Sequence, residues 1–408
     1  GREYIIPKPV DPRLLITVAP AVALAAMKSG VAKHPIENWE AYELQLSKRL
    51  GLDNTLMKVI INKAKTKPKR VVLADAENLS VLKAAQEVLQ DKIATPILLG
   101  NREVIQQILD ENSIKLPGVE IIDPYLPVAD EDKERANRYS ELLFIRRQRQ
   151  GLNKAEAQKI IRRRNYFGSM MVSTGDADAM LSGLTKNYAE AIRPALQIIG
   201  TEEGVKKIAG MYLLLTKRGP IFLADTTVNF NPNAEELADI AMMVAKEVRN
   251  FNITPRIAML SYSNFGSSDS AEAKIVAEAT RILKQRNPSL IVDGEMQASM
   301  AFNKEILKDN YGFSDLVDED VNVLIFPNLT SGNVAYNLLK EIGGADAIGP
   351  ILLGLKKPVH VLQLGSSVRS IINMALVAVV DAQLKSRIDT DEAVQRSSWW
   401  KRLKKKNK

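Results

Sequence analysis

Cysteine is absent from the sequence, which excludes disulfide bridges, thiolate nucleophiles and cysteine-based metal sites. Histidine is nearly absent too: His34 and His360 are the only two, which is too few for a histidine-rich metal site. A chain without disulfides is typical of a reducing compartment. We therefore expect a cytoplasmic protein that binds no metal of its own.

The sequence also lacks long apolar runs. Its longest, such as Ala375–Val380 and Ile351–Leu355, fall well short of the roughly 20 residues that a membrane-spanning helix needs. No charged segment followed by an apolar one opens the chain, so a secretory signal pattern is missing. The sequence thus predicts no membrane partner.

Aromatic residues make up only 5% of the 408 residues, beside 46% hydrophobic and 25% charged residues, which is ordinary for a globular protein of two or three lobes. The net charge is +8, yet the last ten positions alone hold six basic residues and no acid. Such a tail can hold RNA or an anionic membrane surface by counterion release. A solvated tail is the simpler interpretation, and we predict no nucleic-acid partner.

Two sets of alternating strands and helices define the predicted organisation. One begins at Lys67 and the other after Gly204, and such alternation favours parallel sheets covered by helices. Before them lie two helical patterns, Ala19–Val31 and Asn38–Leu50, and a last helix over Ser370–Leu384 suits a return to the first lobe. The predicted units are 1–66 (a connector), 67–203 with 357–390 (lobe I), 204–356 (lobe II) and 391–408 (a basic tail).

Four polar stretches stand at places suited to ligand binding. Gly175–Gly183 is a small acidic turn that can present N–H groups to an anion, and Ile192–Gln197 carries an arginine, whose planar fork suits phosphate. Ser261–Ser268 and Ile325–Asn333 each follow a predicted strand, where ligands of open α/β sheets gather. Taken alone, the first is better explained as a capped tight turn. The four together favour a ligand cleft.

In chain order, the motifs G-D-A-D with S-G behind it, R-P-A-L-Q-I-I, S-Y-S with G-S, V-D-G-E-M-Q, F-P-N-L with G-N, and G-P-I resemble the landmarks of the phosphotransacetylases. These enzymes pass an acetyl group between acetyl phosphate and coenzyme A. The resemblance covers about Lys67 to Ser386. It implies a two-lobed α/β fold of mainly parallel sheets flanked by helices, with a cleft between the lobes.

The opening segment resembles a second family. Tyr4–Pro9, Asp11–Leu14 and Ala19–Ala23 are similar to the end of a bacterial malic enzyme domain. A malic enzyme end followed by a phosphotransacetylase-like body is the layout of the hybrid malic enzymes. In these, an upstream domain uses NADP and a divalent metal to convert malate oxidatively to pyruvate, and the appended domain regulates it through acetyl-CoA. The resemblance implies that this chain is the appended domain.

The chain departs from the family where the chemistry lies. Active members carry P-V-N-D-L-S-R-G-x-x-x-x-D-I, in which the serine bonds the coenzyme thiol, the arginine stabilises the phosphate charge and the aspartate acts as base. Aligned without a gap, this sequence has Gln363, Leu364 and Ser370 at these positions. A further family arginine is replaced by Glu341, which reverses a charge expected near the cleft. No catalytic residue is expected to remain.

Two family arginines are matched, by Arg193 in the R-P-A-L motif and by Arg147 four residues before Gly151. Arg147 is equally explained as a solvated charge on a basic helix. The resemblance implies an acetyl-CoA site in the cleft. The residues expected there are Arg193, Arg147, Ser261, Ser263, Asn264, Ser331, Gly332, Asn333, Gln363, Asp176 and Ser182.

Three functions stay open on the sequence alone. The first is a regulatory domain in which acetyl-CoA closes the cleft, on hinges near Gly204 and Lys357, and changes the activity of a malic enzyme. The second is a working phosphate acetyltransferase with His360 as base and Arg369 as phosphate clamp. The third is a structural oligomerisation domain. We expect a homo-oligomer, with a dimer formed through this domain and a higher assembly in the full protein.

Overall fold

The computed structural model describes residues 13–39, 42, 46, 55–127, 129–185 and 188–386. The segment before Arg13, most of the helix predicted over Asn38–Leu50, and the basic tail lie outside the described residues. Helix α1 (Arg13–Lys28) begins six residues before the start predicted at Ala19. Among the described residues, no helix is both long and apolar enough to cross a bilayer.

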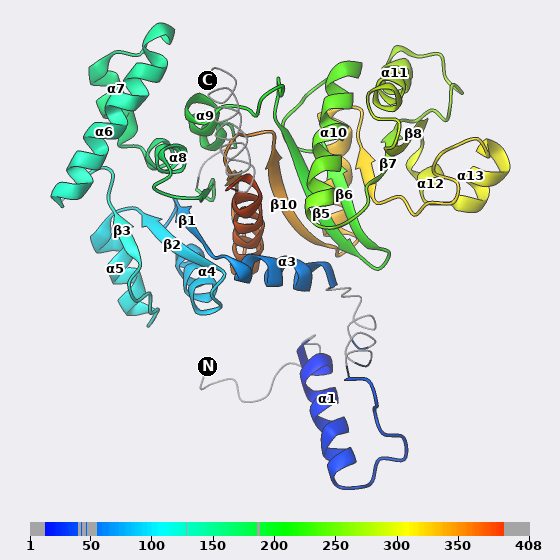
Figure 1. Ribbon diagram of the computed structural model, residues 1–408, viewed down its shortest axis with the longest axis horizontal. Helices are drawn as coiled ribbons and strands as arrows, with labels where there is room; N and C mark the ends of the chain where they lie inside the picture. The colour runs from blue at the N-terminus through cyan, green and yellow to red at the C-terminus, as the bar shows by residue number, and fades with distance from the viewer. Residues whose placement is uncertain are drawn as a thin grey trace, which may run out of the picture.

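Lobe I is a five-stranded sheet in the order β11-β4-β1-β2-β3, and every pairing in it is parallel (Figure 1). Helices cover both of its faces, and α6, η1 and α7 extend from its outer edge. The strands are β1 (Lys69–Leu73), β2 (Ala94–Leu99), β3 (Glu120–Ile122), β4 (Ala179–Ser182) and β11 (Val359–Val361). The helices are α4 (Leu79–Gln90), α5 (Arg102–Glu111), α6 (Asp130–Arg147), η1 (Gln148–Gln150), α7 (Lys154–Ile161), α8 (Arg164–Thr174) and α9 (Tyr188–Ile198).

Lobe II is a six-stranded sheet in the order β10-β5-β6-β9-β7-β8. The run from β6 to β8 is parallel, whereas β5 and β10 are added antiparallel. The strands are β5 (Ala209–Thr216), β6 (Gly219–Ala224), β7 (Arg256–Leu260), β8 (Ile291–Met296), β9 (Val323–Ile325) and β10 (Asp346–Leu353). The helices are α10 (Ala234–Asn250), α11 (Ala271–Arg286), α12 (Ala298–Ala301), α13 (Lys304–Tyr311) and α14 (Leu329–Glu341). The predicted fold class, mainly parallel sheets flanked by helices, is confirmed.

Asparagine side chains fix where many of the helices begin. An Asn oxygen accepts a backbone N–H in the first turn, which satisfies a group that has no partner within the helix. At α7 and α10 the third helical residue, a glutamate, bonds back to the cap and completes a capping box. The capping residues are Asn78, Asn101, Asn153, Asn233, Asn303 and Asn328.

Three strands, β4, β10 and β11, were not predicted from the sequence. The second half of the acidic turn predicted over Gly175–Gly183 is β4, which lies between β1 and β11 with all four residues buried. Its brevity, and the aspartates before it, concealed it. Strand β10 was not predicted, because Gly349 and Pro350 lie within it, where the register to β5 shifts. The Gly-Pro pair is a strong turn signal in sequence.

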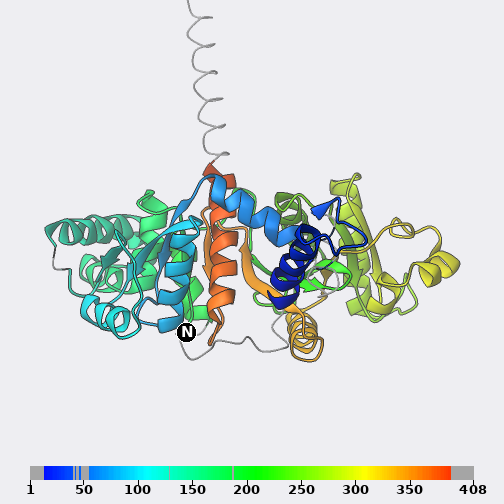
Figure 2. The ribbon, with the colours of Figure 1, turned by 90° about the horizontal axis from the view of Figure 1, so that it is seen from below.

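A helix over residues 368–386 joins the two lobes (Figure 2). Its apolar residues from Met374 to Val380 belong to one continuous core with residues of α4, α10 and α3 (Thr55–Thr66). The Gln383 amide donates to the carbonyls of Lys63 and Ala64, at 3.0 and 3.1 Å, and so ties this helix to α3. The two lobes therefore share buried apolar surface.

Charged side chains are also buried at the seam between the lobes. Glu247 of α10 is 8% exposed, and Asp381, on the joining helix, is 7% exposed. The ammonium of Lys385 lies 3.5 Å from both Asp381 and Glu202, and the His360 ring lies 3.6 Å from the other Asp381 oxygen. A small cavity of about 260 Å³ opens beside them. The seam thus holds a cluster of both charges, in which the carboxylates of Glu202, Glu247 and Asp381 lie beside the ammonium groups of Lys246 and Lys385.

Burial, and then the nearby charge of Asp381, raise the pKa of Glu247 to about 7. Burial opposes ionisation of Asp381 as well, but Lys385 and His360 outweigh it and hold that pKa below its usual range. Asp381 therefore stays ionised while Glu247 keeps a proton. Because the pKa of Glu247 is raised on folding, the stability that it contributes is present at low pH and is lost as pH rises through about 7.

Glu247→Gln should therefore stabilise the protein at alkaline pH, by roughly 1–3 kcal/mol, and change little at about pH 5. The amide keeps the bond that Glu247 accepts from Asn250. Thermal unfolding of both proteins at about pH 5 and about pH 8.5 measures the effect. Glu141→Gln, an exposed position on α6, is the control. A gain in Tm that is equal at both pH values would show that Glu247 does not titrate.

Candidate functional site

A cavity of about 710 Å³ opens between the two lobes. One wall comes from lobe I, where α9 begins and where the chain leaves β11, and the other comes from β5, the loop after β6 and the start of α14. The lining residues are Tyr188, Tyr212, Thr227, Leu329, Thr330, Asn333, Val334, Pro350, Leu362, Gln363 and Leu364. Apart from Tyr212 and Pro350, which lie within the antiparallel strands β5 and β10, the lining residues follow the carboxyl ends of parallel strands, the usual ligand edge of an open α/β sheet.

Two buried aspartates shape the loops on either side of this cavity. In lobe I, Asp75 accepts the N–H groups of Gly183 and Leu184 at 2.9 and 3.1 Å, on the path from β4 to Tyr188. In lobe II, Asp225 accepts the N–H of Thr227 at 2.9 Å and those of the two following residues at 3.1 and 3.0 Å. These bonds fix Gly183 and Leu184 in lobe I and the loop after β6 in lobe II.

Asp225 stays a strong acceptor in an apolar setting. It is 2% exposed, and burial raises its pKa even though several N–H groups bond to its charged form. Gly332 of α14 packs directly on this residue: a Cβ there would lie 2.3 Å from the carbonyl oxygen of Asp225. Only glycine lets α14 approach the loop so closely, which explains the glycine of the predicted G-N motif.

Hydroxyl groups at the cavity lack hydrogen-bond partners among the described residues. These buried hydroxyls belong to Tyr188, Tyr212 and Thr227, which line it, and to Ser182 and Thr226, which are fully buried and end or follow strands that lead to the lining loops. Such groups typically destabilise a fold by about 1–3 kcal/mol each when they stay unpaired. Five of them at one cavity indicate a site built for a polar ligand.

Aromatic rings connect these groups across the cleft. Tyr212 and Tyr336 stack with ring centroids 3.7 Å apart, and the Tyr336 hydroxyl lies 3.4 Å from the side-chain oxygen of Gln363 in lobe I. Burial is the main cause that raises the pKa of Tyr188 and of Tyr212 above the ordinary value of tyrosine. Both hydroxyls therefore remain neutral donors, in surroundings that disfavour a negative charge.

The structure brings several of the expected ligand residues to this cavity. Gln363 and Asn333 line it, and the Asn333 amide donates to the carbonyl of Thr226 at 3.2 Å. Ser331 and Gly332 lie in the same first turn of α14, where Ser331 bonds the capping Asn328. Ser182 ends β4, and its carbonyl accepts the N–H of Leu362. Of these residues, Gln363 and Asn333 line the cavity, whereas Ser331, Gly332 and Ser182 belong to the segments that carry its lining but do not line it themselves.

Other expected ligand residues lie elsewhere. Ser261, Ser263 and Asn264 follow β7, which lies two strands away from β6, and they do not line the cavity. The Ser263 hydroxyl donates to Glu295 at 2.8 Å, and the Asn264 side chain accepts the N–H of Gln297 at 2.8 Å. Their polar atoms hold their own loop together.

Neither family arginine reaches the cavity lining. Arg193 is exposed on α9, five residues past Tyr188, and Arg147 ends α6. The neighbouring Arg146 donates to the carbonyl of Ile198 at 2.6 Å, so the end of α6 packs at the far end of α9. Both arginines thus lie away from the hydroxyl-lined cavity, toward the other end of that helix.

Of the four positions where the family's catalytic residues are replaced, two line the cavity and two do not. Gln363 and Leu364 line the cavity, with Leu364 69% exposed, whereas Ser370 bonds Ser367 in the joining helix. Glu341 lies at the last residue of α14, exposed beside Lys340, while the first turns of that helix contact the cavity. The helix thus carries Glu341 away from the cavity, and its effect on phosphate binding stays a prediction.

His360 and Arg369, the two residues that could have replaced the catalytic groups, make contacts away from the cavity. His360 is fully buried in β11, and its Nδ1 accepts the N–H of Leu352 at 3.2 Å. Arg369 pairs with Asp346 at 3.2 Å on the surface. Neither side chain lines the cavity, so a substituted acetyltransferase site receives no support. Among the described residues, no three His, Asp or Glu side chains gather as a metal site.

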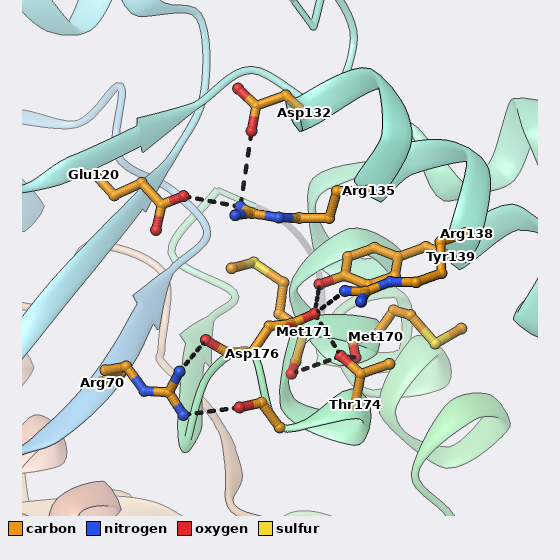
Figure 3. Close-up of polar contacts among 11 residues, drawn as sticks. Arg70, Glu120, Asp132, Arg135, Arg138, Tyr139, Met170, Met171, Thr174 and Asp176 are labelled. Carbon is orange, nitrogen blue, oxygen red and sulfur yellow. Dashed lines mark hydrogen bonds and ion pairs between the residues drawn. The ribbon is translucent and has the colours of Figure 1, made fainter. Parts of the chain in front are cut away.

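Asp176 lies before β4, at the amino end of the strand and so at the opposite edge from the cleft. Figure 3 shows it among side chains of α6 and α8. Its carboxylate accepts bonds from Arg138, from Tyr139 and, at 2.9 Å, from Thr174. Burial favours the neutral acid, but these bonds outweigh it and hold the pKa of Asp176 below its usual range. Asp176 therefore joins α6 and α8 to the sheet, and the structure separates it from the expected ligand site.

Replacing this carboxylate should destabilise the fold and leave ligand binding unchanged. Asp176→Ala leaves the buried Tyr139 hydroxyl without its partner, so we expect a loss of about 1–3 kcal/mol in the free energy of unfolding. Denaturant unfolding measures it, with Asp269→Ala, at a side chain 95% exposed, as control. If the variant instead binds acyl-CoA more weakly and keeps its stability, Asp176 belongs to the ligand site and the prediction is wrong.

Comparison with known proteins agrees with this architecture. Residues 55–379 match the family model of phosphate acetyl/butaryl transferases. The phosphate acetyltransferase of Bacillus subtilis is 35% identical over 80% of this chain and 99% of its own length. The structure of a phosphotransacetylase from Streptococcus pyogenes superposes with a TM-score of 0.74 at 34% identity, covering 81% of this chain and 98% of that one.

Malic enzymes are similar over more of the chain. The NADP-dependent malic enzyme of Haemophilus influenzae is 41% identical over 94% of this chain, and that of Escherichia coli is 40% identical over 94%. The chain spans about half the length of these curated relatives. The phosphotransacetylase-like region thus occurs within larger malic enzymes, and the chain belongs to the phosphate acetyl/butaryl transferase family.

Proposed function

We propose that this domain binds acetyl-CoA between its lobes, performs no acetyl transfer, and regulates the malic enzyme domain of a larger polypeptide. One observation carries the proposal: among the residues that the structure describes, those lining the cavity include no charged side chain. A transferring phosphate needs fixed positive charge, and a thiol needs a base before it can attack. The lining offers hydroxyls, amides and apolar groups, which suit a neutral thioester.

A second cavity offers room for the nucleotide end of the ligand. It measures about 560 Å³ and is lined in part by Leu196, Lys206, Lys207 and Phe230, whose ring is 77% exposed. Both cavities border α9 and the loop after β6. Tyr188 and Leu196 are eight residues apart on that helix, about 12 Å along its axis. An extended pantetheine arm spans such a distance.

This arrangement gives the two family arginines a place in the proposal. Arg193 precedes Leu196 by about one turn of α9, and Arg147 lies near the far end of that helix. With Lys206 they supply positive charge on the side where the coenzyme phosphates would lie, while Lys207 is partly neutralised by Glu236. We assign them to the nucleotide and not to the acyl group.

Regulation would follow from closure of the lobes around the ligand. The similarity to NADP-dependent malic enzymes supports an upstream malic enzyme domain. That this domain holds NADP and a divalent metal, and that the protein is a homo-oligomer built in part by the domain described above, are further parts of the proposal. A coupling of ~1–3 kcal/mol between the two sites is typical of allosteric proteins. Acetyl-CoA at saturation should then change the malate oxidation rate of the full-length enzyme. An unchanged rate together with tight binding would reject the regulatory role.

The binding preference of the isolated chain tests the cavity chemistry. Calorimetric titration should show binding of acetyl-CoA and none of acetyl phosphate, and the chain should release no acetyl phosphate from acetyl-CoA and phosphate. The Streptococcus pyogenes phosphotransacetylase serves as the active control. Turnover comparable to that control would overturn the proposal, and so would tight binding of acetyl phosphate.

Adding one positive charge should reverse the exclusion of phosphate. Leu364→Arg places a guanidinium at a cavity-lining position, so we expect measurable binding of acetyl phosphate, with Leu364→Gln as an uncharged control. Both are measured by the same titration. If the arginine variant binds no better than the glutamine variant, the missing charge is not what keeps phosphate out.

A further inference from the structure

Three hydroxyl groups from both lobes converge on the cavity. Tyr188 comes from the first residue of α9 in lobe I, and Tyr212 and Thr227 come from β5 and the loop after β6 in lobe II. Thr227 lies close enough to Tyr188 to affect its pKa, and Tyr188 in turn affects the pKa of Tyr212. Yet none of the three meets hydrogen-bond geometry with a described residue. Their mutual contacts, of Tyr188 with Thr227 and of Tyr212 with Tyr336 and Gln363, affect the tyrosine pKa values but fall short of good hydrogen bonds, so these hydroxyls are at most weakly bonded.

Their positions are built and not accidental. The bonds to Asp75 fix the start of the loop that leads to Tyr188, and Asp225 accepts the backbone N–H of Thr227 itself. Tyr212 is 1% exposed and is held by its stack on Tyr336. A buried polar atom held in place without a partner is a recognised mark of a functional site.

The chemistry of the missing partner follows from these surroundings. Neutral hydroxyls in a poorly solvated pocket donate best to an acceptor that carries no full charge, and the burial that keeps Tyr188 and Tyr212 protonated penalises an anion equally. A carbonyl oxygen has two lone pairs and can accept from two donors at once. An acyl thioester presents such an oxygen at the end of a long arm.

We propose that the hydroxyls of Tyr188 and Thr227 donate together to the carbonyl oxygen of a bound acyl thioester, so that this single oxygen joins lobe I to lobe II. The inference rests on the proposed function and adds to it the atoms that read the acyl group. Tyr212 forms the wall behind that oxygen. Free coenzyme A lacks this carbonyl and cannot make the bridge, although its arm carries amide carbonyls of the same chemistry.

Variants that remove only the hydroxyls test the assignment in the full chain. Tyr188→Phe and Thr227→Val are each titrated with acetyl-CoA and with coenzyme A. Each should weaken acetyl-CoA binding roughly five- to tenfold and leave coenzyme A within about twofold of the wild type. Tyr166→Phe, which removes a hydroxyl bonded to Gln197 in lobe I, is the matched control.

Thermal unfolding without ligand separates this role from a structural one. The two hydroxyls have no partner within the described fold, so their removal should leave Tm unchanged or raise it. A lowered Tm in both variants would reveal structural bonds and overturn the assignment. Equal weakening of both ligands, or of neither, would overturn it as well, because the bridge would then not involve the thioester carbonyl. A wild-type chain that binds no acetyl-CoA would instead refute the proposed function.

Discussion

Apolar packing along one helix, residues 368–386, holds the two lobes together. Its face from Met374 to Val380 belongs to the same continuous core as α4 of lobe I and α10 of lobe II. Hydrophobic burial of this extent is the main stabilising contribution in proteins, so neither lobe keeps its core intact without the other. One shared core therefore supports both walls of the cleft, so a small change in packing at the seam affects the position of both walls.

Within that frame, each lobe uses the same local device. A buried aspartate near the carboxyl end of a strand, Asp75 after β1 and Asp225 after β6, gathers backbone N–H groups and fixes a loop beside the cleft. The two loops carry Tyr188 and Thr227 toward a common point. Rigid loops explain how neutral side chains can supply a specific site, because little conformational freedom is left to lose on binding.

The sequence predicted the fold well where elements are long and periodic. It failed at β4, a four-residue strand preceded by aspartates, and at β10, which contains a Gly-Pro pair. These are tertiary effects, since burial between neighbouring strands overrides the local turn signals.

The site was predicted only in part. Asn333 was found because its stretch follows a predicted strand, and Gln363 because it aligns with the catalytic serine of the family. The hydroxyls of Tyr188 and Thr227 were missed because they come from separate stretches that carry no motif. Asp176 was assigned to the ligand because an acidic turn looks the same whether its carboxylate faces a ligand or, as here, the guanidinium of Arg138. Only the paths of the strands distinguish the two cases.

The chain has the fold of the phosphate acetyl/butaryl transferase family, and the described residues that line the cavity between its lobes are neutral. The proposed role is to sense an acyl thioester without consuming it. The most direct measurement is a crystal structure of the chain grown with acetyl-CoA. The account predicts the acetyl carbonyl between Tyr188 and Thr227, with the nucleotide toward Phe230. A fully occupied ligand whose thioester lies outside this cavity would contradict it.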